Sequence, residues 1–111
     1  MAKKEIPAEV RDEITRIVQK FNKKTFKGRE DQVFYFAEIK KNFLYLKRKE
    51  YGKLAPVARL TYTGDMKEWE FAIFKWTWDG YDPDEFFFPG AEFVDGTIEG
   101  AMKAGLEAYP I

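Results

Sequence analysis

The sequence predicts one α+β domain, a two-layer fold in which an N-terminal and a C-terminal helix pack against an antiparallel meander of four or five strands. Three observations support this class. The chain has 111 residues, the length of a single domain that can bury its own core. Apolar residues recur with helical spacing near both ends, whereas they alternate with a period of two in between. The segments between the expected strands are short, and short connections join antiparallel neighbours.

Residues 7–22 are expected to form the first helix. The apolar positions of this segment fall on one face of a helix: Val10, Ile14, Ile17, Val18 and Phe21. Pro7 suits the start of the helix, because the N–H that proline lacks has no partner there. The polar stretch that follows, residues 22–31, contains Gly28 and is expected to be a loop.

Four strands and a possible fifth are expected in the middle of the chain, which gives the order α-β-β-β-β-(β)-α over the single domain 1–111. The segments are rich in aromatic and β-branched residues. Turns or loops are expected at 40–42, 51–56, 64–67 and 79–84. The expected strands cover residues 32–39, 43–50, 57–63, 68–78 and, as the possible fifth, 85–88.

Both sides of the fourth expected strand are apolar. One side carries Trp69, Phe71 and Ile73. The other side carries Ala72, Phe74, Trp76 and Trp78. A strand of this kind is either covered on both faces or leaves one aromatic row open to a partner, and the pattern does not say which side faces the helices.

Residues 97–108 are expected to form the second helix, with Asp95 or Thr97 as the capping residue. Gly100 and Gly105 weaken this helix intrinsically, by about 1 kcal/mol for each interior glycine. It therefore depends on packing, and its small residues are expected to let it approach the sheet closely.

The composition excludes much of the usual catalytic chemistry. The chain contains no His, no Cys and no Ser, so it has no Ser-His-Asp triad, thiol nucleophile or Cys-based zinc site. The acidic loop 79–85 lacks the ligand order of an EF-hand, and a solvated turn explains its residues as well as a bound cation does. We expect no catalytic residues, no metal site and no cofactor. Whether the protein is an enzyme stays open, although the composition argues against it.

The formal net charge of zero conceals two opposed halves. Residues 1–59 hold 16 basic and 8 acidic side chains, a net charge of +8, and residues 60–111 hold 3 and 11, a net charge of −8. The halves either neutralise each other within the fold or present surfaces of opposite sign. No apolar run approaches the ~20 residues of a membrane span, and no signal peptide is evident. We therefore expect a cytoplasmic protein that does not enter the membrane.

A first candidate site combines cations with aromatic rings in the first expected hairpin. Single-strand nucleic-acid binders use cations for phosphates and rings for bases. Alternation along residues 43–50 places Leu44, Leu46 and Arg48 on the core side, which leaves the opposite row for a ligand. The candidate nucleic-acid residues are Lys41, Phe43, Tyr45, Lys47 and Lys49. Lysines that protect an exposed strand edge would give a similar pattern.

A second candidate is an aromatic surface for a partner. The segment 76–93 holds more aromatic residues than a short strand and loop need, and large exposed aromatic patches mark interfaces. The candidate interface residues are Trp76, Trp78, Tyr81, Phe86 and Phe88. The main expectation is therefore a small non-catalytic binding or assembly module for a protein partner, a second copy in a homodimer, or a small ligand. Single-stranded nucleic-acid binding through the first hairpin is the alternative.

Overall fold

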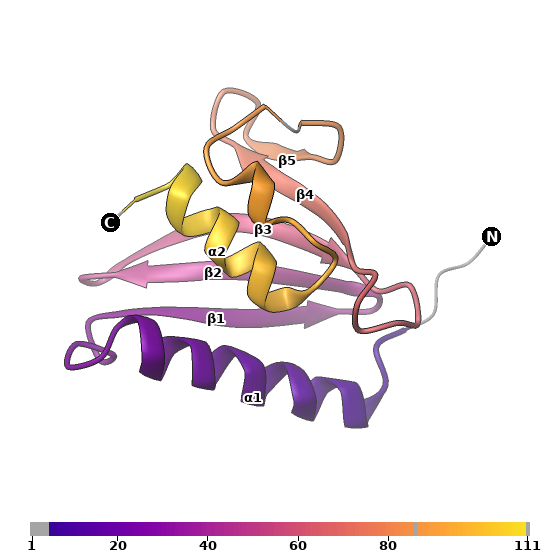
Figure 1. Cartoon of the computed structure of the whole chain (residues 1–111), viewed down its shortest axis with the longest axis horizontal. Coiled ribbons are helices and arrows are strands. Elements are labelled where there is room, and N and C mark those ends of the chain that lie inside the picture. Colours follow the sequence, from indigo (N-terminus) through magenta and orange to yellow (C-terminus); the bar gives the residue numbers. More distant parts are fainter. Residues whose placement is uncertain (1–4, 86, 111) are drawn as a thin grey trace.

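The computed structural model describes residues 5–85 and 87–110, and it confirms the predicted α+β class with a meander sheet. Five strands form one antiparallel sheet in the order β1-β2-β3-β4-β5 (Figure 1). Along the chain the elements are α1 (Ala8–Thr25), β1 (Val33–Lys40), β2 (Phe43–Glu50), β3 (Lys53–Thr61), β4 (Glu70–Lys75), β5 (Gly80–Asp82), the 3-10 helix η1 (Ala91–Phe93) and α2 (Ile98–Ala108). In the part of the chain that is described, no helix is both long and apolar enough to cross a membrane.

The first helix extends further than predicted, to Thr25 rather than to residue 22. The Pro7 carbonyl accepts hydrogen bonds from the backbone N–H groups of Val10 and Arg11, at 3.1 and 3.0 Å, so proline precedes the first turn instead of opening it. The extra turn carries Phe26 into the core, where only 2% of it is exposed. The predicted apolar stripe is confirmed by the buried side chains of Ile14, Val18 and Phe21.

The β2–β3 hairpin is longer than predicted, because β3 begins at Lys53 and not at residue 57. Tyr51 and Gly52 have φ angles of 51° and 88°, the left-handed pair that a two-residue hairpin turn requires. The expected loop is therefore a tight turn. Pro56 is accommodated in β3 next to a register shift opposite Leu46 and Lys47, where a proline costs the sheet little.

The prediction of a fifth strand at 85–88 is wrong. The last strand is β5, which lies inside the segment expected to be a loop and pairs Tyr81 with Phe74 of β4. The chain reverses directly after Lys75, so that Trp76 and Trp78 lie in a turn rather than at the end of a long strand. Phe88 stacks on Phe71 at a centroid distance of 5.9 Å and packs against the core.

The second helix agrees closely with its prediction. Thr97 is the capping residue, and its side chain accepts a hydrogen bond from the Gly100 N–H at 3.0 Å. Asp95 instead binds Thr97, and this hydrogen bond lowers the pKa of the Asp95 carboxyl. Gly105 confirms the expected close approach, because a Cβ there would lie 2.4 Å from a methyl carbon of Val57.

Both helices pack on the same face of the sheet. Their apolar side chains share one core with the β1 and β2 residues Val33, Tyr35, Leu44 and Leu46, and with the β3 and β4 residues Ala58, Leu60, Phe71 and Ile73. Of the two apolar sides of the fourth strand, the one with Phe71 and Ile73 therefore faces the helices. Ala72 and Phe74 are also buried, but they lie outside this core on the opposite face.

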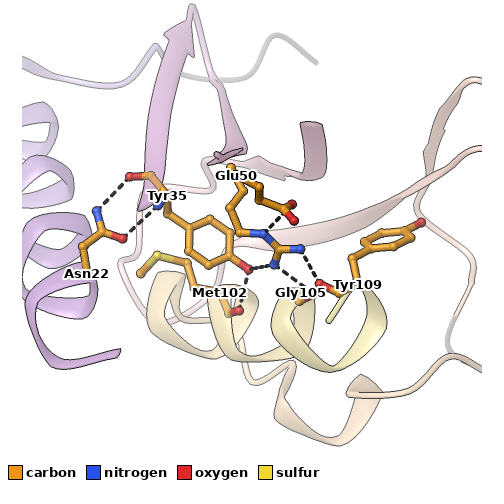
Figure 2. Close-up of polar contacts among 7 residues, drawn as sticks. Asn22, Tyr35, Glu50, Met102, Gly105 and Tyr109 are labelled. Carbon is orange, nitrogen blue, oxygen red and sulfur yellow. Dashed lines mark hydrogen bonds and ion pairs between the residues drawn. The ribbon is translucent and has the colours of Figure 1, made fainter. Parts of the chain in front are cut away.

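Arg48 connects α2 to the middle of the sheet. Only 1% of Arg48 is exposed, and its guanidinium donates to the Glu50 carboxylate at 3.0 Å (Figure 2). It also donates to the backbone carbonyls of Gly105 and Tyr109 at the end of α2. These carbonyls lie at the negative end of the helix dipole, so a buried cation is favoured there. The Gly105 carbonyl also accepts from the backbone N–H of Tyr109 at 2.9 Å, and Arg48 is a second donor to it.

Tyr35 extends the same polar network towards α1. Its hydroxyl donates to the Met102 carbonyl at 2.8 Å and accepts from Arg48 at 3.3 Å. Its backbone N–H and carbonyl both bind the Asn22 side chain at 2.8 Å (Figure 2). The Asn22 amide thus takes the place of one strand partner at the outer edge of β1, and the network links α1, the sheet and α2.

We expect the substitution Arg48→Ala to lower the free energy of unfolding by about 3 kcal/mol or more, because it removes a donor from the Tyr109 carbonyl and the cation that pairs with the Glu50 carboxylate. Lys49→Ala, one residue along and on the exposed side of β2, should change it by less than about 0.5 kcal/mol. Urea unfolding followed by circular dichroism measures both. A similar small loss for the two variants would contradict the role assigned to Arg48.

The stability of the fold should also fall at high pH. Burial raises the pKa of the Tyr35 hydroxyl to about 12, above the value of about 10 expected for the unfolded chain. The folded state thus favours the protonated phenol, and this contribution is complete below about pH 10 and is lost as the pH rises towards about 12. Urea unfolding across this window should show a steeper decline for the wild type than for Tyr35→Phe. Parallel declines would assign the effect to other groups.

Candidate functional site

The face of the sheet opposite the helices is the candidate site, and we call it the open face. Alternation along the strands places every second side chain on it, and the register aligns Tyr45 of β2, Arg59 of β3 and Ala72 of β4 in one row. Its members are Phe34, Phe36, Glu38, Lys40, Phe43, Tyr45, Lys47, Lys49, Leu54, Pro56, Arg59, Thr61, Glu70, Ala72, Phe74 and Tyr81. Among the described residues, the core that the helices cover includes none of these side chains.

Aromatic rings form a continuous chain of contacts across the open face. The Tyr45 ring lies 5.6 Å from that of Tyr81, which lies 5.2 Å from the ring of Phe74. Phe43 extends the chain at one end, and Trp76, in the β4–β5 turn, extends it at the other. Contact between Tyr45 and Tyr81 across two intervening strands is possible because Ala72 between them is small. The result is a platform of aromatic rings. Each ring is partly buried by the neighbouring rings and not by a helix.

Cations are interleaved with these rings. The Arg59 guanidinium lies 4.9 Å from the centroid of the Phe43 ring and 5.6 Å from that of Tyr81. Such contacts stabilise a cation without consuming its hydrogen-bond donors. The Nε atom of Arg59 is buried and has no hydrogen-bond partner in the described part of the chain. Arg59 is therefore held in place by ring faces and retains unused donors.

Two carboxylates moderate the positive charge of the open face. Lys40, Lys47, Lys49 and Arg59 oppose Glu38 and Glu70, which leaves a net charge of +2. Glu38 lies 3.3 Å from the Lys47 ammonium and 3.6 Å from that of Lys40. The hydrogen bond from Lys47 and its positive charge lower the pKa of the Glu38 carboxyl, which stays ionised at neutral pH. Lys49, opposite Phe34, is exposed.

The structure places most of the sequence-predicted nucleic-acid residues, and two of the interface candidates, on this one surface. Phe43, Tyr45, Lys47 and Lys49 all lie on the open face, and Lys41 lies in the adjoining β1–β2 turn with a φ of 56°. The interface candidates Trp76 and Tyr81 belong to the same chain of rings.

The other interface candidates lie elsewhere. Trp78 is 62% exposed in the β4–β5 turn, with the Lys75 ammonium 5.0 Å above its ring. Phe88 packs against the helix-covered core and is separate from the open face. Phe86 lies outside the described residues. The predicted interface therefore divides between two places.

Sequence reasoning missed the contribution of β3 and β4 to the site. Arg59, Phe74 and Ala72 complete the surface, and only their registers with Tyr45 and Tyr81 reveal it. A period-two pattern was visible in each strand. What was missing was the identity of the face that the helices cover.

A depression of about 520 Å³ adjoins the platform on the open face. It is lined by Arg59, Thr61, Glu70, Phe71, Ala72 and Pro83. A larger depression of about 570 Å³ lies beside the start of α2, on the helix side of the molecule. The carboxylates that line it would repel an anion: Glu13, Glu92, Asp95 and Glu99. Two of them already have partners, because Asp95 binds Thr97 and Glu99 pairs with Lys103.

Two carboxylates of the acidic loop 79–85 pair with a cation of the protein itself. The Lys75 ammonium lies 3.0 Å from the Glu85 carboxylate and 3.5 Å from that of Asp82. Within the described residues, no group of three or more His, Cys, Asp or Glu side chains is arranged to hold a metal ion.

A scan of protein-family models and searches of curated proteins and solved structures found no match to this chain. The open face therefore provides the strongest functional argument.

Proposed function

We propose that the protein is a non-catalytic module that binds single-stranded nucleic acid across the open face of its sheet. One observation carries this proposal: aromatic rings and cations interleave on a sheet face that neither helix covers. A single strand presents both a chain of negative phosphates and a set of flat bases, and these two components match cations and rings. The cytoplasmic location expected from the sequence belongs to the same proposal.

The arrangement suits a single strand better than a duplex. The bases of a duplex are stacked on one another and expose only their edges, so the rings of Tyr45 and Tyr81 would have no base faces to contact. An unpaired strand can splay its bases onto a sheet while its phosphates contact Lys47 and Lys49. Rings that already touch each other also lose little side-chain freedom when a base stacks on them.

Charge also disfavours pairing two open faces with each other. Each face carries a net charge of +2, so a symmetric dimer formed through it would bring two positive surfaces together. A polyanion has the complementary sign. The exposed Trp76 and Trp78 keep a protein partner or self-association as the competing outcome, and the binding experiment must distinguish it.

Binding of a labelled oligothymidine or oligouridine, followed by fluorescence anisotropy, should weaken steeply with salt. If the four cations of the open face each neutralise a phosphate, log Kd should change with log salt with a slope of about 3, or roughly 50-fold between about 50 and 200 mM. The double variant Lys47→Glu, Lys49→Glu should weaken binding by about tenfold or more. Lys20→Glu with Lys24→Glu changes the net charge equally on α1 and should have little effect.

Two results would overturn this proposal. One is the absence of binding by the wild-type protein at low salt. The other is an equal loss of affinity in both charge-reversal variants, which would indicate attraction to overall charge and not to the open face. Light scattering on the same samples detects self-association. A dimer that protects Trp76 from acrylamide quenching would favour the assembly function instead.

Glu38→Gln should tighten binding at low salt, by about threefold, because it releases the ammonium groups of Lys40 and Lys47 for phosphates. Glu13→Gln is the matched control, since it removes a similar ion pair with Arg16 from the surface of α1. The control should leave the affinity unchanged. Weaker binding by Glu38→Gln would mean that its carboxylate positions the lysines rather than competing with the ligand.

A further inference from the structure

We propose that the depression beside Arg59 receives one base of the bound strand and selects guanine; this inference rests on the proposed function. The depression has a volume of about 520 Å³, within the range of sites for small molecules. Arg59 lines the depression and also contacts the rings of Phe43 and Tyr81, so a strand that crosses the platform can place a base in it. Ala72, the smallest residue of its row, is one of the residues that line it.

The polar groups around the depression differ in what they offer. Arg59 lines the depression and supplies guanidinium donors. Glu70 supplies a carboxylate, which accepts hydrogen bonds only. The register pairs Arg59 with Ala72 and Thr61 with Glu70, so the donor and the acceptor are diagonal neighbours on one face. Glu70 also interacts elsewhere in the protein, but a carboxylate can accept several donors.

Guanine is the base that matches both groups. Its O6 and N7 atoms are adjacent acceptors, the pair that a guanidinium binds most often in nucleic-acid complexes. Its N1–H and its amino group are adjacent donors, which together suit a carboxylate. Adenine and cytosine each lack the N–H beside the amino group, and thymine and uracil lack the amino group. A site that joins Arg59 and Glu70 therefore discriminates by the pattern of donors and acceptors and not by size alone.

Short labelled thymidine strands with one central base replaced provide the test. One guanine should tighten binding about fivefold or more relative to the all-thymidine strand, whereas adenine or cytosine should not. Hypoxanthine lacks the amino group of guanine and 7-deazaguanine lacks its N7, so each should lose part of the gain. In Glu70→Gln the guanine preference should disappear while oligothymidine binding remains. Glu68→Gln, which removes a nearby exposed carboxylate outside the depression, should retain the preference.

The possible outcomes separate the two proposals. If no strand binds at low salt, the proposed function fails and the guanine site fails with it. If every strand binds with one affinity, the open face binds nucleic acid but the guanine site is wrong. A guanine preference that survives unchanged in Glu70→Gln would also overturn the site. Because Glu70 is exposed, the variant should fold, and its thermal unfolding checks this.

Discussion

The buried guanidinium of Arg48 determines how this fold is closed. A cation that is 1% exposed is costly unless hydrogen bonds satisfy it, and here the partners come from three elements: Glu50 of β2, Tyr35 of β1 and the carbonyls at the end of α2. These partners require α2 to cross the sheet with its C-terminal end over Arg48. Since α1 packs beside α2 on the same side, the other side of the sheet remains uncovered. The existence of the open face thus follows from where Arg48 is buried.

In the part of the chain that the structure describes, the ion pairs do not join the two oppositely charged halves. Among the described residues, each ion pair joins partners from the same half: Glu38 with Lys40 and Lys47 in the first half, and Lys75 with Asp82 and Glu85 in the second. Arg48 of the first half instead binds backbone carbonyl groups of the second half, which carry no formal charge. The surplus of lysine therefore stays on the surface, and part of it lies on the open face. A net charge of zero is compatible with a local site for a polyanion.

The sequence was sufficient for the features that depend on local pattern. The two helices, the Thr97 cap and the facing of Leu44 and Leu46 follow from periodicity and capping chemistry within a few residues. Other features cannot be predicted from the sequence, and the main one depends on residues that are far apart along the chain. Alternation places Arg48 on the core side, but nothing near it indicates what satisfies a buried cation there, because the carbonyls that accept from it lie 57 and 61 residues away. The reason β5 was missed is local: it has only three residues, too few to show a period of two, and it becomes a strand because the chain turns back after Lys75.

The candidate site also combines residues that could be predicted from one strand with residues that could not. The row of Phe43, Tyr45, Lys47 and Lys49 was visible within one strand, whereas Arg59 and Phe74 joined it only through the sheet register. This register also explains how an aromatic surface can stay open without a covering helix. Arg59 lies between the rings of Phe43 and Tyr81, and Phe74 is buried among its aromatic neighbours, so the rings cover much of one another's apolar area. What remains exposed is a mixture of ring faces and cations, which resists collapse onto a second copy and yet keeps the groups that a nucleic-acid strand would contact.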